Sequence, residues 1–143
     1  TASKFYSFCE KNGFSNQWIL NNNHYEYEGY AICGTRGWFF EEDRGGTHDE
    51  KVFRRELIRL ESSLKSAGDK NKIVFLHYPP IFAKYECPEI LELLKKYQVK
   101  KCYYGHIHGK GRTISFNGER DGTHYKLVSA DNVDFCPVKV LDY

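Results

Sequence analysis

Residues 72–80, KIVFLHYPP, join a run of apolar side chains to a histidine and a pair of prolines. The consecutive apolar residues 73–76 predict a short strand that is buried on both faces of a sheet. Pro79 and Pro80 restrict the backbone, so the loop that carries His77 is expected to be stiff. This stretch therefore predicts a central strand with a histidine at its carboxyl end.

The residues that follow this strand predict a parallel crossover. Residues 88–98, PEILELLKKYQ, favour a helix with Pro88 in its first turn, and residues 100–105, KKCYYG, favour a second strand. A strand–helix–strand unit over residues 73–104 places its two strands in parallel, side by side or close by. Their carboxyl ends then reach the same edge of the sheet, where ligands bind in open α/β folds.

Three histidines follow the strands of this crossover. His77 comes directly after the first strand, and His106 and His108 follow the second strand in the stretch YYGHIHG. The i, i+2 spacing turns both rings of the pair to one side of an extended backbone, and Gly105 permits an unusual turn just before them. Neutral imidazole suits zinc, manganese or iron, so we expect these three side chains to form a metal site.

The other histidines and the cysteines are interpreted as structural or surface residues. His24, His48 and His124 are each expected to be hydrogen-bonded at the surface. Cys102 could act as a fourth ligand of a closed zinc site, but it precedes the glycine turn and is expected to face the core. The five cysteines are irregularly spaced, which argues for reduced thiols and a cytoplasmic location rather than a disulfide framework.

The rest of the chain predicts a mixed α/β (α+β) fold with a β-rich end, and 143 residues suit a single domain, 1–143. The strongest helix pattern covers residues 47–68, where Thr47 and Glu50 form a capping box. We expect a further helix at residues 2–13, a charged loop at 39–46, and short strands at 17–20, 24–29, 30–35, 112–118, 123–130 and 137–143.

Composition limits the partners of the protein. The net charge is +2, and acidic residues alternate with basic ones, so we expect no basic face for nucleic acid. No apolar stretch approaches the length of a membrane span, and the N-terminal residues lack the apolar core of a signal peptide. We therefore expect neither a membrane nor a nucleic acid as a partner.

The histidine motifs resemble those of a known family. LHYPP at residues 76–80, followed by YGHIHG at 104–109, is similar to the fourth and fifth motifs of the calcineurin-like metallophosphoesterases. The stretch YAICGTRGW, residues 30–38, is similar to a strand and loop in a bacterial branch of that family. The resemblance implies a four-layer α-β-β-α sandwich, in which two β-sheets are flanked by helices.

The same resemblance implies metal-dependent hydrolysis of phosphate esters, that is, a phosphatase or phosphoesterase acting on a phosphorylated substrate. His77 and His106 would ligate one of two divalent metal ions, manganese, iron or zinc, and His108 would ligate the other. A hydroxide that bridges the two ions would attack the phosphate, without a covalent enzyme intermediate.

The sequence departs from the family in its carboxylates. The Asp-x-His and Gly-Asn-His-Asp/Glu motifs, which supply metal ligands and the general acid in the family, have no counterpart here. We therefore expect the chain to be the C-terminal portion of a longer phosphoesterase and to be inactive alone. The alternative is a self-contained, non-catalytic metal-binding or interaction domain. Asp43, Asp49 and Asp131 are interpreted as loop, helix-start and turn residues.

Arg36 is the candidate for substrate binding. It follows a predicted strand in the stretch GTRGW, residues 34–38, and a guanidinium so placed could contact a phosphate through two hydrogen bonds. An ordinary surface ion pair is the alternative. The neighbouring Trp38 and Phe39 could either pack on the core or line the pocket.

Overall fold

The computed structural model of the protein describes residues 2–38 and 47–141. The helices are α1 (Ala2–Lys11), α2 (Thr47–Ser66) and α3 (Pro88–Lys96), with short 3₁₀ helices η1 (Gly109–Ile114) and η2 (Ala130–Asn132). The strands are β1 (His24–Tyr27), β2 (Tyr30–Thr35), β3 (Asn71–Leu76), β4 (Ile81–Phe82), β5 (Tyr85–Glu86), β6 (Lys101–Tyr104), β7 (Gly118–Arg120) and β8 (Thr123–Leu127).

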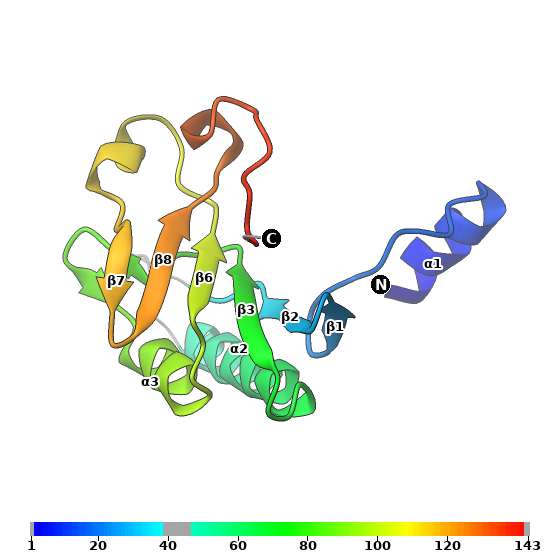
Figure 1. Ribbon diagram of the computed structural model, residues 1–143, viewed down its shortest axis with the longest axis horizontal. Coiled ribbons are helices and arrows are strands. Elements are labelled where there is room, and N and C mark those ends of the chain that lie inside the picture. The colour runs from blue at the N-terminus through cyan, green and yellow to red at the C-terminus, as the bar shows by residue number, and fades with distance from the viewer. Residues whose placement is uncertain (1, 39–46, 142–143) are drawn as a thin grey trace.

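One mixed sheet organises the fold, with the strand order β1-β2-β3-β6-β8-β7 (Figure 1). Strands β2, β3, β6 and β8 run parallel, and the edge strands β1 and β7 are antiparallel to their neighbours. The predicted β3–α3–β6 crossover is confirmed, because Leu76 pairs with Tyr104 at the adjacent carboxyl ends of the two strands. The mixed α/β fold class is confirmed as well.

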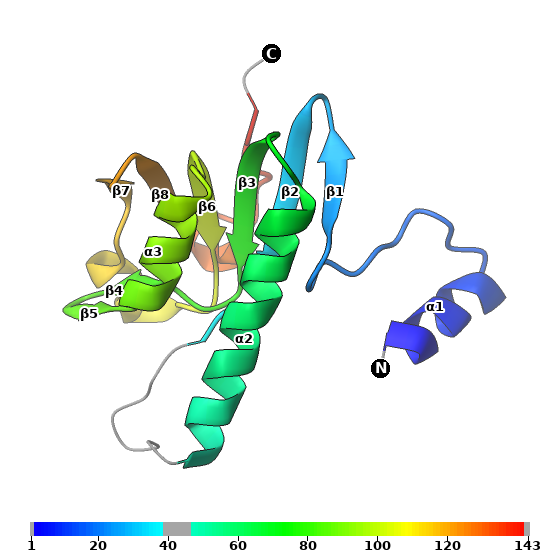
Figure 2. The same cartoon turned by 90° about the horizontal axis from the view of Figure 1, so that it is seen from below.

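Helices α2 and α3 cover one face of this sheet (Figure 2). Leu60 and Leu64 of α2 and Ile90 and Leu94 of α3 are at most 1% exposed and belong to one apolar cluster with the sheet. The amphipathic spacing of both helices produces this packing, since residues three or four apart share a helix face. This helix–sheet layer contains the main core and fixes the strand ends that carry the histidines.

The other face of the sheet is also apolar but is less well covered. Ile73 and Tyr103 are buried there beside Leu141 of the C-terminal segment, whereas Ile32 and Phe75 are only partly buried. The C-terminal segment and the sheet border a groove of about 420 Å³. Parallel sheets usually have both faces covered, and the described residues cover this face only in part.

Three of the predicted strands are wrong. Residues 17–20 are irregular, because tyrosine side chains bind their backbone: Ile19 N donates to the Tyr6 hydroxyl, and Ile19 O accepts from the Tyr25 hydroxyl. Residues 112–118 lie largely in η1 and the loop after it, so that β7 begins only at residue 118. Residues 137–141 form no strand.

The remaining elements agree with the prediction in type. The helix expected at residues 2–13 is α1, which lies apart from the sheet, and the helix expected at 47–68 is α2 (Figure 1). The side chain of Thr47, and with it the capping box, lies outside the described residues, as does the loop at 39–46. Within the described chain, no helix is both long and apolar enough to cross a membrane.

Candidate functional site

Backbone hydrogen bonds tie together the loops that follow β2, β3 and β6. The amides of His77 and Tyr78 donate to Arg36 O at 3.0 and 2.9 Å. The amide of Gly105 is shared between Leu76 O at 3.3 Å and His77 O at 3.2 Å. Three segments that are distant in sequence therefore meet at one edge of the sheet, in fixed positions relative to one another.

His77 and His106 lie in direct contact at this edge. His77 Nε2 is 3.1 Å from His106 Nδ1, and the ring centroids are 4.9 Å apart. Two imidazole nitrogens bound to one ion at about 2.0–2.1 Å, with a bond angle of about 90–110°, would be about 2.9–3.4 Å apart. The observed separation fits a shared metal ion, and it also fits a direct hydrogen bond when one of the nitrogens carries a proton.

The unusual backbone conformation falls on His106 and not on Gly105. His106 has φ = +71°, whereas Gly105 is absent from the residues with positive φ in the described chain. The unusual backbone that was expected at Gly105 is therefore found one residue later, and the assumption of an extended backbone at His106 is wrong. A left-handed residue other than glycine costs about 1–2 kcal/mol and is concentrated at functional sites. Ile107, which is 8% exposed, anchors the loop in the core.

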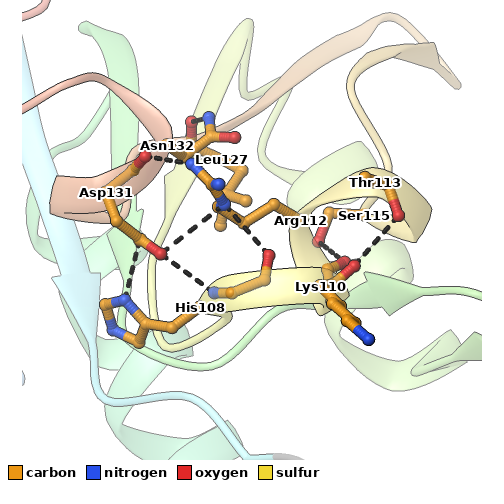
Figure 3. A network of polar contacts seen from close by, with 10 residues as sticks. His108, Lys110, Arg112, Thr113, Ser115, Leu127, Asp131 and Asn132 are labelled. Carbon is orange, nitrogen blue, oxygen red and sulfur yellow. Dashed lines mark hydrogen bonds and ion pairs between the residues drawn. The ribbon is translucent and has the colours of Figure 1, made fainter.

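His108 pairs with a carboxylate (Figure 3). Its Nδ1 is 2.8 Å from Asp131 Oδ1, and Asp131 Oδ2 accepts from the Gly109 amide at 2.9 Å. Arg112 donates to Asp131 O, and its Nε lies 3.5 Å from Oδ2. The Gly109 amide, followed by His108, holds the pKa of the Asp131 carboxyl below its ordinary value. When His108 Nδ1 carries the proton, Nε2 keeps its lone pair, and this side chain is 63% exposed.

Asp131 has a larger role than the sequence indicated. It lies in the turn-like η2 helix, as the turn interpretation requires, but its carboxylate also fixes the ring of His108. The contact arises because β8, which precedes Asp131, is the parallel neighbour of β6, which precedes His108. That adjacency was the signal missing from the sequence, where Asp131 follows only one predicted strand among several.

Arg36 lies at the same edge as the histidine pair. Its guanidinium is 5.0 Å from the ring centroid of Trp38 and 5.9 Å from that of Tyr78. The Tyr78 ring in turn contacts His77 and His106, with centroids 4.8 and 4.4 Å apart. Trp38 also packs against the apolar core, and Phe39 lies outside the described residues.

A buried carboxylate lies at ion-pair distance from the guanidinium of Arg36. Glu56 is 2% exposed, and its Oε1 is 3.9 Å from Arg36 Nη2 and 2.6 Å from Arg59 Nη1. Its Oε2 accepts from the Thr35 hydroxyl at 2.8 Å. Arg36 therefore has the ion pair of the alternative interpretation, at a long distance, while its side chain remains 47% exposed beside the histidines.

The remaining candidates lie elsewhere. Cys102 is fully buried, which raises its thiol pKa, and all five cysteines are free. His24 Nδ1 is 2.7 Å from the Ser66 hydroxyl, and His124 is exposed on β8. Asp49 lies in the first turn of α2 as expected. Asp43 and the side chain of His48 lie outside the described residues.

The described residues contain no group of three or more His, Cys, Asp or Glu side chains arranged to hold a metal ion. The structure brings His77 and His106 together, and it pairs His108 with Asp131 at the same edge of the sheet. Comparison of the chain with protein-family models, curated proteins and solved structures gave no match.

Proposed function

We propose that the chain carries the histidine ligands of a metal-dependent phosphoesterase. The observation that carries this proposal is the 3.1 Å separation of His77 Nε2 and His106 Nδ1, at the carboxyl ends of two adjacent parallel strands. Manganese, iron and zinc ions all accept imidazole nitrogen. A pair of such ions, when bound, polarises a phosphoryl group and activates water.

The residues of the site divide between binding and positioning. His77 and His106 would hold one ion, and His108 would offer Nε2 to a second ion. Asp131 supports this role, because a carboxylate on the other ring nitrogen fixes the tautomer and orientation of a ligating histidine. Arg36, which remains half exposed beside Tyr78, would bind a phosphate oxygen of the phosphorylated substrate.

The carboxylate ligands and the general acid are proposed to come from residues other than those that the structure describes. Two divalent ions need carboxylates to offset their charge, and the described residues place none beside the histidine pair. The open apolar face around Ile32 and Phe75 supports the four-layer sandwich, because a second sheet would cover it. If those residues belong to another part of a longer protein, the isolated chain would be inactive. The free cysteines support a cytoplasmic location for the whole protein.

A non-catalytic metal-binding or interaction domain is the second candidate. The metal-ligating atoms support this candidate, since two imidazoles without a third ligand in the described chain suit a weak, single metal site. Arg36 would then serve as a surface ion-pair partner of Glu56.

The deciding experiment is phosphatase activity of the protein expressed from its native gene. Hydrolysis of an aryl phosphate and of an aryl phosphodiester is measured with added Mn²⁺, Fe²⁺ or Zn²⁺. We expect metal-dependent turnover that is lost in His106→Asn, in which asparagine preserves the left-handed backbone. His108→Ala should lower kcat more than it raises KM, because the remaining ion can still bind phosphate.

The exposed His124 on β8 provides the matched control, and His124→Ala should retain full activity. The phosphoesterase proposal is wrong if His106→Asn retains normal turnover. Metal binding without hydrolysis of either substrate would favour the non-catalytic domain.

A further inference from the structure

A basic pocket lies at the opposite edge of the sheet from the histidines. It has a volume of about 430 Å³ and is bordered by the start of β3, the residues before β6, and the ends of α2 and α3. Its charged lining residues are Lys65, Asp69, Lys70, Lys72, Lys96 and Lys100. These lysines are dispersed between acidic residues in the sequence, so their convergence is a product of the fold.

Carboxylates, including that of the lining residue Asp69, neutralise only part of this charge. Lys70 pairs with Glu26 at 3.2 Å, and Lys96 pairs with Glu61 at 2.7 Å. The other three pocket lysines form no ion pair with a described residue: Lys65, Lys72 and Lys100. One of the three lies in the last turn of α2, where it also offsets the helix dipole, but the other two are not in helices.

Lys72 is the unusual member of this group. It is 6% exposed, and as the second residue of β3 it shares the helix-covered face with Val74 and Leu76. Its Nζ donates to Lys70 O at 3.0 Å. An ammonium group has three donors, and a buried cation needs an anionic or strongly polar environment. The pocket that Lys72 borders is the place from which such an anion can reach it.

We propose that this pocket binds a small anion that carries two phosphate groups. Lys72 would contact the anion from the inner wall, and the exposed Lys65 and Lys100 would contact it from the rim. Several lysines at one site favour a compact anion of multiple charge, and Lys is a frequent phosphate ligand. The volume lies within the usual range of small-molecule sites, so a second phosphate group can be accommodated.

The proposal is independent of the histidine site, and its test keeps the two apart. Binding of pyrophosphate and of inorganic phosphate to the protein is measured by calorimetry in metal-free buffer, so that no metal at the histidines can recruit phosphate. Amide NMR shifts report the location. We expect pyrophosphate to bind more tightly than phosphate, with shifts at residues 70–72 and 96–100 rather than at 105–109. Raising the salt concentration should weaken the binding.

The charge variants distinguish a defined site from general attraction. Lys72→Met, which preserves the length of the side chain, should weaken pyrophosphate binding at least tenfold. Lys65→Gln combined with Lys100→Gln should do the same through exposed positions that leave folding intact. The control for Lys72→Met is Lys51→Met, an exposed change of equal charge at the start of α2, far from the pocket along that helix. The control for the double variant is Lys51→Gln combined with Lys84→Gln, two exposed positions outside the pocket.

Three results would overturn the proposal. The first is no pyrophosphate binding in the millimolar range. The second is an equal loss of binding in the double variant at Lys65 and Lys100 and in the double control at Lys51 and Lys84, which would indicate non-specific attraction. The third is equal affinity for phosphate and pyrophosphate, which would remove the second phosphate group from the proposal. If Lys72→Met does not fold, the double variant decides the outcome.

Discussion

Replacing His106 should remove the ability of zinc to stabilise the fold. The distance of 3.1 Å between His77 Nε2 and His106 Nδ1 allows both nitrogens to bind one ion. With metal–nitrogen bonds of about 2.05 Å, the two bonds enclose an angle of about 98°, within the range that zinc accepts. A single imidazole has no such chelating geometry, so the loss of either ring should abolish zinc binding at this site.

The size of the effect follows from linkage. Zinc at 100 times its dissociation constant, bound only by the folded chain, adds about 2.7 kcal/mol to the free energy of unfolding. For a chain of this length, about 1 kcal/mol corresponds to about 2–4 °C in Tm. We therefore expect zinc to raise the Tm by about 5–11 °C.

The assay is thermal unfolding with and without zinc, monitored by circular dichroism. His106→Asn should unfold at nearly the same temperature as the unaltered protein when zinc is absent, because asparagine tolerates the left-handed backbone. It should show no shift when zinc is present. His124→Ala, on the exposed side of β8, should keep the full shift. A zinc shift that persists in His106→Asn, or disappears in His124→Ala, would refute the assignment of the pair as a metal site.

Three further outcomes test the structure around the site. Gly34→Ala should lower the free energy of unfolding in urea by at least about 3 kcal/mol, because the added Cβ would lie 2.1 Å from a backbone oxygen of β3. In Gly105→Ala the added Cβ would lie 3.7 Å from its nearest neighbour, so this control should cost less than about 1 kcal/mol. In NMR, the Asp131 carboxyl should titrate below its ordinary pKa of 3.8. Its contribution to stability is therefore present above pH 3.8 and is lost as the pH falls through the lower pKa of the folded state. Asp131→Asn should remove this part of the loss of stability in acid. A thiol reagent should label only Cys136 in the native protein and all five cysteines after denaturation, since the others are buried.

The local sequence was sufficient to predict the helices and strands whose hydrophobic patterns are strong. The apolar run 73–76 predicted the central strand, and the helical spacing over residues 47–68 predicted α2, because burial and periodicity are properties of neighbouring residues. Chain order was sufficient to bring His77 and His106 to one edge, because a crossover of this length leaves its two strands parallel and adjacent.

Tertiary structure decided the features that depend on distant partners. Residues 17–20 have a strand-like composition, but Tyr6 and Tyr25 bind their backbone, and a local pattern does not reveal such partners. The pairing of His108 with Asp131 depends on β8 lying beside β6, and several strand orders were compatible with the sequence. The left-handed backbone at His106 likewise depends on the loop contacts around it.

The distribution of charge differs most clearly between the linear sequence and the folded structure. Along the chain, basic residues alternate with acidic ones, and a net charge of +2 indicates no basic surface. In the fold, lysines from the ends of two helices, the start of β3 and the residues just before β3 and β6 converge on one pocket, while nearby carboxylates neutralise only some of them. A linear sequence determines how much charge there is, but electrostatic interaction depends on distances in space, and only the packing of α2 and α3 on the sheet sets those distances.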